Sequence, residues 1–277
     1  MHSGTAGKGA TKPVAPFAFW LLPFAITLAV SLSRPTLAAT CPADHASERA
    51  EVAYVYDGDT LKLKDGRRVR LIGINTPELG HKGQAIQPLA QAARTSLKDL
   101  LDSSNRKLLL QYGKQRHDHY GRALAHAFLD NGENVAAHLL SQGLATTFIV
   151  PPNSWGQHCY QKLEQVARAA RLGLWALPAY QPHPSRTLPL HTRGFQIVKG
   201  QVRSIRRTRH TFWLDLEGPL TIQIPLKSLA SFSSYAVDTL EGQDIEARGW
   251  ISANGDRLKM KVQHPATLVI MTPPQKR

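Results

Sequence analysis

The chain has 277 residues, and its 34 Lys and Arg against 20 Asp and Glu give a formal net charge of +14 at pH 7. Hydrophobic content of 42% and charged content of 19% exclude a disordered or fibrous protein and are typical of globular domains. The length favours two domains, and the basic balance indicates a polyanionic partner, either nucleic acid or an anionic membrane surface. A basic protein without such a partner is the alternative.

Residues 1–39 have the pattern of a targeting segment. Lys8 and Lys12 precede an apolar run at residues 17–32, and small residues follow at positions 38 and 39. The run is shorter than the roughly 20 residues that a membrane span needs. We therefore predict a signal peptide and an exported protein, periplasmic or secreted. An uncleaved anchor in the inner membrane is the alternative.

Export changes the interpretation of the two cysteines, Cys41 and Cys159. An even number of cysteines in an oxidising compartment favours a disulfide, here one that ties the mature N-terminus to the body of the protein. Two unrelated free thiols are the alternative.

Strand-like runs open the next part of the chain. Apolar residues alternate over residues 52–75, with Asp-Gly turns at 57–58 and 65–66. From Ile86 to Leu101 they recur with the 3.6-residue period of an amphipathic helix. The same patterns predict two further strands, at residues 107–112 and 123–129, and two further helices, at residues 135–142 and 157–172.

Residues 177–192 contain four prolines and little apolar periodicity, which predicts a semi-rigid spacer. We place a boundary here, between a first domain at residues 40–176 and a second at residues 193–271, which a tail at residues 272–277 follows.

Short strand-like runs with little helix fill the second domain. The runs lie at residues 195–203, 211–216, 220–225, 244–250, 257–262 and 267–271, with a short helix expected within 228–240. Three strands, an insertion and two strands is the order of an OB-fold, so we predict a small OB-like β-barrel.

Three clusters in the first domain carry reactive side chains. Asp57-Gly58-Asp59-Thr60 places carboxylates at a glycine turn, where they can face a hard cation. Arg70 on a strand and Glu78 after a proline turn suit phosphate binding and activation of water. Asp118-His119-Tyr120-Gly121-Arg122 puts an arginine and an aromatic ring on one side of a turn. Taken singly, each is also compatible with an ordinary surface turn.

In this order and spacing, the three clusters resemble the thermonuclease (micrococcal nuclease) family. The resemblance spans about residues 50–176 and includes Gly143-Leu144-Ala145, Pro152-Asn153 and Leu174-Trp175. It implies a five-stranded OB barrel with three helices, so the expected fold class is α+β followed by β. It also implies calcium-dependent hydrolysis of DNA or RNA that leaves 3′-phosphates.

The resemblance assigns roles to individual residues. Arg70 and Arg122 match the two arginines that clamp the phosphate, and Glu78 matches the glutamate that deprotonates or orients water. Tyr120 matches a tyrosine that contacts the phosphate. Asp59 matches a calcium-binding aspartate.

Two more positions belong to the implied calcium site. Thr76 matches the threonine whose main-chain carbonyl binds calcium. Asn75 stands where the best-known members have an aspartate ligand. The site therefore has one negative charge fewer, and we expect weaker calcium binding.

The second domain has a dense basic turn before two aromatic residues, Phe212 and Trp213. Basic and aromatic side chains together on a small barrel are typical of single-stranded nucleic-acid binding. We therefore predict substrate contacts by Arg206, Arg207 and Arg209. A spacer, a membrane-surface contact or a protein partner is the alternative for this domain.

Together these features predict an exported nuclease that acts on DNA or RNA, and they imply no stable protein partner. The runner-up is a non-catalytic nucleic-acid-binding or scaffold protein on the same fold.

Overall fold

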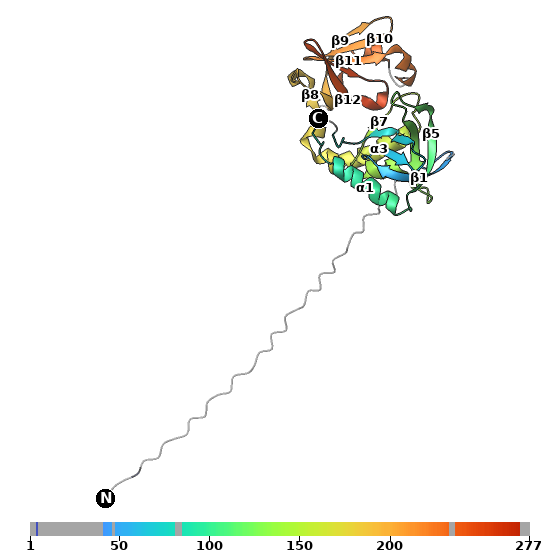
Figure 1. Ribbon diagram of the computed structural model, residues 1–277. Helices are drawn as coiled ribbons and strands as arrows, with labels where there is room; N and C mark the ends of the chain where they lie inside the picture. The colour runs from blue at the N-terminus through green and yellow to red at the C-terminus, as the bar shows by residue number, and fades with distance from the viewer. Residues whose placement is uncertain (1–3, 5–40, 46–47, 81–84, 233–235, 272–277) are drawn as a thin grey trace. The chain divides into compact units, whose positions relative to one another are not determined.

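The protein is described from a computed structural model that covers residues 4, 41–45, 48–80, 85–232 and 236–271 (Figure 1). The predicted signal segment, apart from residue 4, and the predicted tail lie outside the described residues. Among the described residues, no helix combines the length and apolar character that crossing a membrane requires. The two barrels described below belong to one compact unit.

The first barrel closes in the strand order β1-β2-β3-β6-β5, with β3 and β6 parallel and the other neighbours antiparallel. Its strands are β1 (Glu48–Val55), β2 (Thr60–Leu63), β3 (Arg68–Leu71), β5 (Lys107–His117) and β6 (Ala123–Phe128). The predicted five-stranded OB barrel is confirmed.

Alternation explains this barrel, because every second side chain of a strand points inward. Leu61 and Leu63 of β2, and Val69 and Leu71 of β3, are almost completely buried in its core. Strand β6 is buried along its whole length, so both of its faces are covered.

Three helices accompany the barrel: α1 (Ala90–Asp102), α2 (Val135–Ser141) and α3 (Gln157–Ala169). Ala93, Leu97 and Leu101 of α1 are fully buried at the spacing of one helix face. The helix begins at Ala90 rather than at the predicted Ile86. Leu89 has the left-handed φ of 64°, which an α-helix does not tolerate, and Ile86 is 66% exposed.

A short two-stranded sheet joins β4 (Gly73–Asn75) to β7 (Thr146–Phe148). Gly73 pairs with Phe148, and Asn75 pairs with Thr146. The sequence pattern did not predict β7, because three residues are too few to show alternation. This sheet holds the segment that leads into the Asn75-Thr76 turn.

The second barrel is built from β9 (Gly194–Arg207), β10 (Thr211–Leu216), β11 (Leu220–Pro225), β12 (Asp244–Asn254) and β13 (Arg257–Lys261). The β12–β9 pairing closes the ring β9-β10-β11-β13-β12, and β11 and β13 are parallel. This is the strand order of the first barrel, so the predicted second OB-like barrel is also confirmed.

Short elements complete the second barrel. Strand β8 (His183–Pro184) pairs with β9, and β14 (Leu268–Ile270) pairs with β12. Between β11 and β12, where a short helix was expected, lie the 3-10 helices η4 (Leu226–Phe232) and η5 (Val237–Thr239). Figure 1 shows β8 in yellow and the labelled strands β9 to β12 in orange to red.

The proline-rich segment at residues 177–192 differs from the expected spacer. It contains the 3-10 helices η2 (Pro178–Tyr180) and η3 (Ser185–Thr187), as well as β8. Tyr180 is buried in a cluster with Trp175 of the first domain and Ile197 of the second. The prolines of residues 177–192 therefore lie in packed turns that join the two barrels. The division at residues 176 and 193 stays a prediction.

Two ion pairs connect α3 with strand β12 of the second barrel. Arg168 donates two hydrogen bonds of 2.8 Å to the carboxylate of Glu246. Arg248 donates one of 2.6 Å to Glu164, and both side chains of that pair are buried. Glu246 and Arg248 are alternate residues of β12, so one face of this strand lies against the first domain.

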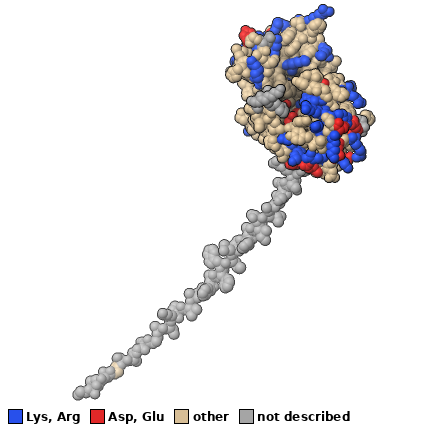
Figure 2. Space-filling model, in the orientation of Figure 1, with Lys and Arg blue, Asp and Glu red and all other residues tan. Residues whose placement is uncertain are grey.

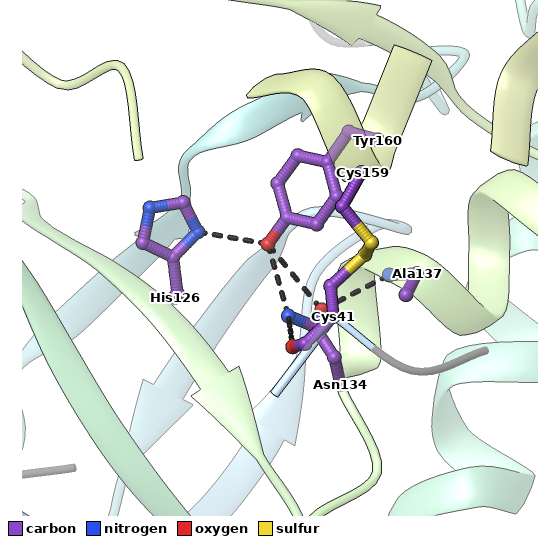
Figure 3. Close-up of a disulfide and its surroundings, with 6 residues drawn as sticks. All are labelled: Cys41, His126, Asn134, Ala137, Cys159 and Tyr160. Atoms are coloured by element: carbon purple, nitrogen blue, oxygen red, sulfur yellow. Dashed lines mark hydrogen bonds between the residues drawn. A yellow bond between two sulfur atoms is a disulfide. The ribbon is translucent and has the colours of Figure 1, made fainter. Parts of the chain in front are cut away.

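A disulfide joins Cys41 to Cys159 at the start of α3 (Figure 3). Close by, Asn134 donates a 3.0 Å hydrogen bond to the Cys41 carbonyl and one of 3.1 Å to the Tyr160 hydroxyl. The same hydroxyl lies 2.9 Å from Nδ1 of His126, and burial lowers the pKa of His126 to about 3. A neutral polar network therefore supports the attachment of the Cys41 segment to α3.

Candidate functional site

A pocket of about 970 Å³, called the site pocket below, lies at the ends of β3 and β4 beside the turn from β5 to β6. Five predicted site residues line it: Arg70, Asn75, Glu78, Tyr120 and Arg122. The barrel thus gathers residues that are far apart in the sequence. Asp59 joins the group through its ion pair with Arg70, and Thr76 joins it through its hydrogen bond to Asp59.

The Asp57-Gly58-Asp59-Thr60 turn connects β1 to β2. The main-chain N–H of Asp59 donates to Oδ1 of Asp57 at 2.9 Å, which fixes the turn. A Cβ atom on Gly58 would lie 2.8 Å from side-chain atoms of Ala93 and Thr76. Glycine is therefore required here, because α1 and the Asn75-Thr76 turn pack directly against the backbone.

Asp59 is the centre of the buried part of the site. Its Oδ2 lies 3.0 Å from Nη2 of Arg70 and accepts a 2.8 Å hydrogen bond from the main-chain N–H of Thr76. Its Oδ1 accepts a 3.2 Å bond from the Thr60 hydroxyl. Arg70 also donates to the carbonyl of Leu71 at 2.5 Å. One carboxylate thus ties together the Asp-Gly-Asp turn, β3 and the turn after β4.

Asp57 is a further member of the site pocket that the predicted site residues did not include. Burial raises the pKa of its carboxyl to about 7, and the neighbouring Asp59 carboxylate adds to this shift. The two acids therefore repel each other in a region shielded from water, a setting that a cation relieves. The sequence signal that could have identified Asp57 was its position in the Asp-Gly-Asp-Thr motif.

Glu78 sits in the turn after β4, and its backbone is held from both sides. Its N–H donates to the Gln87 side chain at 2.9 Å, and the Gln87 N–H donates to the Glu78 carbonyl at 2.9 Å. These reciprocal bonds fix the turn that presents Glu78 to the site pocket.

Arg122 is positioned by Asp118 within its own turn. Oδ2 of Asp118 accepts from Nε of Arg122 at 2.7 Å, and Oδ1 accepts from the N–H groups of Tyr120 and Arg122 at 2.9 Å. Although burial acts in the opposite direction, the hydrogen bonds from Arg122 hold the pKa of Asp118 below its usual range. The Arg122 guanidinium lies 5.5 Å from the ring of Tyr120, which is 73% exposed.

The basic residues predicted on the second barrel do not line the site pocket. Arg206 pairs with Asp215 at 3.0 Å, and Arg207 lies over the ring of Phe212 at 5.5 Å. Arg209 is exposed in the turn between β9 and β10. In the space-filling view, Lys and Arg side chains lie on both barrels with acidic side chains among them (Figure 2).

The second barrel does contribute Trp250 of β12 to the lining of the site pocket. The sequence did not indicate this residue, because its pattern predicts a strand of the second barrel and gives no information on contacts with the first domain.

Asn75 has an unusual environment. The residue is 6% exposed, and its buried Oδ1 has no hydrogen-bond partner among the residues that the structure describes. Among the described residues, no three His, Cys, Asp or Glu side chains form a metal-binding group. A cation site here would therefore need amide or main-chain oxygens besides the two aspartates.

Comparison with known proteins adds to this geometry. Residues 68–177 match the family described as staphylococcal nuclease homologue. The chain is 35% identical over 135 residues to the thermonuclease of Staphylococcus intermedius, covering 48% of this chain and 79% of that protein. The family match ends at residue 177, before the second barrel begins at Gly194.

Two further relatives are from Bacillus subtilis (strain 168). The endonuclease YncB is 34% identical over 129 residues, which cover 45% of this chain and 60% of the relative. The SPbeta prophage-derived endonuclease YokF is 35% identical over 129 residues, which cover 45% of this chain and 43% of the relative.

Proposed function

Because this chain belongs to the family of staphylococcal nuclease homologues, we propose that it is an endonuclease that hydrolyses phosphodiester bonds of DNA or RNA. The main observation behind this proposal is that Arg70, Glu78 and Arg122, which lie in three separate segments of the chain, line one pocket. The thermonuclease and endonuclease names of its relatives support the same reaction.

Attack on a phosphodiester builds negative charge on the phosphoryl oxygens. Preorganised cations stabilise that charge, and the ion pairs of Arg70 with Asp59 and of Arg122 with Asp118 support this role for the two arginines. Glu78 accepts a proton from the attacking water, or orients it, from the fixed turn after β4. Tyr120, beside Arg122, contacts the bound phosphate. As the water oxygen bonds to phosphorus, the P–O5′ bond breaks and the 5′-oxygen takes up a proton, so the products carry 3′-phosphates and 5′-hydroxyls.

We include calcium in this proposal because the oxygen donors of the site fit a hard cation. Asp59, the Asn75 side chain and the Thr76 carbonyl would hold it, with Asp57 nearby. The buried Oδ1 of Asn75, which has no partner within the described part of the chain, and the mutual repulsion of the two aspartates support this fit. A bound calcium ion supplies additional positive charge to the phosphate.

Hydrolysis by the purified chain tests the proposal. We expect cleavage of single- or double-stranded DNA, or of RNA, that stops when a calcium chelator is added and returns with excess calcium. Binding of nucleic acid without cleavage in any of these conditions would instead favour the non-catalytic binding protein.

Asn75→Asp is expected to tighten calcium binding, because a carboxylate replaces a neutral amide where the ligand charge tunes affinity. Calorimetric titration with calcium measures this without relying on activity, and the half-saturating calcium concentration for hydrolysis should fall in parallel. Asn131→Asp, in the exposed turn before α2, adds the same charge outside the site pocket and is the control. Equal or weaker calcium binding by Asn75→Asp would remove Asn75 from the site.

We also propose that Arg206, Arg207 and Arg209 bind substrate phosphates outside the site pocket. Phosphate contacts release counterions, so Arg207→Glu with Arg209→Glu should weaken binding of a single strand and flatten its salt dependence. An unchanged salt slope would assign this surface another role.

Export is the last part of the proposal. The Cys41–Cys159 disulfide supports it, because disulfides persist in oxidising compartments. An N-terminal membrane anchor remains the alternative to a cleaved signal.

A further inference from the structure

Trp250 belongs to the second barrel but lines the same pocket as Arg70, Glu78 and Arg122. The residue is 44% exposed, although tryptophan is highly buried on average. Trp250 is not part of the hydrophobic core of the second barrel, which other residues form.

The backbone that carries Trp250 is firmly placed. Arg248, two residues earlier on the same face of β12, is bound to Glu164 at 2.6 Å. The same Glu164 oxygen accepts a 2.8 Å hydrogen bond from the N–H of Thr147 in β7. One buried carboxylate thus fixes β12 against β7 directly before Trp250 and Phe148.

Two phenylalanines hold the indole. Its ring centroid lies 4.8 Å from that of Phe148 and 5.3 Å from that of Phe195, at interplanar angles of 89° and 71°. Both rings therefore stand nearly upright to the Trp250 ring, and neither forms a parallel stack with it. Phe148 in turn pairs with Gly73 on β4, the strand that ends at Asn75.

We propose that Trp250 is a base-stacking residue that binds an unpaired nucleobase next to the phosphate held by Arg70 and Arg122. The inference rests on the proposed nuclease function. A rigid, partly exposed indole beside a phosphate-binding pocket provides what single-stranded nucleic acid needs, since each base has a face to stack and each linkage has a charge to pair. Bases inside a duplex are already stacked, so this contact favours single strands or frayed ends.

The test uses the full chain and short single strands in which all linkages but one are uncharged methylphosphonates. The bases flanking the one cleavable bond are either present or replaced by a tetrahydrofuran abasic analogue. Trp250→Leu keeps apolar packing but removes the aromatic face. We expect it to raise KM on the strand with bases by about 5- to 150-fold, the range for loss of one stacked base.

On the abasic strand the wild type and Trp250→Leu should have the same KM, and Trp250→Phe should restore most of the preference for a base. Tyr54→Leu is the matched control, because Tyr54 is 47% exposed and lies outside the site pocket. It should keep the wild-type discrimination. Binding of the same strands by fluorescence anisotropy in a Glu78→Gln background gives a second readout, independent of turnover.

The outcomes distinguish failure of the proposed nuclease function from failure of the stacking role of Trp250. A wild-type chain that cleaves neither strand contradicts the nuclease function, while the binding readout still tests Trp250. An active wild type with equal KM and equal binding for Trp250→Leu on both strands overturns the stacking role and leaves the nuclease function intact.

Discussion

Glu78→Gln is expected to lower the rate of phosphodiester hydrolysis by about a hundredfold to ten-thousandfold, the range for loss of a general base. Glutamine has the same shape but cannot accept a proton from water. The reciprocal bonds with Gln87 involve only the main chain of Glu78, so the turn should survive the change. Single-turnover rates at saturating calcium and substrate measure the effect, and thermal unfolding verifies the fold.

Arg70→Lys is the companion variant, because it keeps a positive charge beside Asp59 but loses the guanidinium fork. Alanine is a poorer choice at this position. It would leave the buried Asp59 carboxylate without its partner, and lost activity could then reflect lost folding. Rates within about threefold of wild type for both Glu78→Gln and Arg70→Lys would refute the assigned roles.

Loss of the Cys41–Cys159 disulfide is expected to lower the free energy of unfolding by about 4–5 kcal/mol, the chain-entropy value for a loop of this size. The bond spans 118 positions, so its removal restores much freedom to the unfolded chain. Urea unfolding with and without reductant measures the difference, and protein purified from its native compartment should show no free thiols.

A Cys41→Ser, Cys159→Ser double variant provides the control for reductant effects elsewhere. Its stability should match that of the reduced wild type and should not change when reductant is added. Two freely titrating thiols in the native protein, or equal stability of the reduced and oxidised forms, would contradict a structural disulfide.

The positions of most strands in both barrels were predictable because alternation of apolar residues survives in short strands, whereas the closed barrel of the first domain was expected from the resemblance to the thermonuclease family. Leu61, Leu63, Val69 and Leu71 follow that pattern and fill the first core. The start of α1 was not predictable, since Ile86 fits the helical period although the left-handed backbone at Leu89 excludes it. Periodicity predicts which face of a helix is apolar, but it does not predict that one residue has a φ that an α-helix excludes.

The site was predictable to the extent that its residues form local motifs. Resemblance selected Arg70, Asn75, Glu78, Tyr120 and Arg122, and the structure brings them to one pocket. Trp250 was not accessible to this reasoning, because its position depends on how β12 docks on α3 and β7. That docking is set by Arg248 and Glu164, which in the sequence are a charged strand residue and a charged helix residue among many.

Helix α3 carries three attachments along its length. Cys159 holds the Cys41 segment, Glu164 binds Arg248, and Arg168 binds Glu246. The helix is therefore a common support for the covalent tie of the first domain and for the strand that presents Trp250.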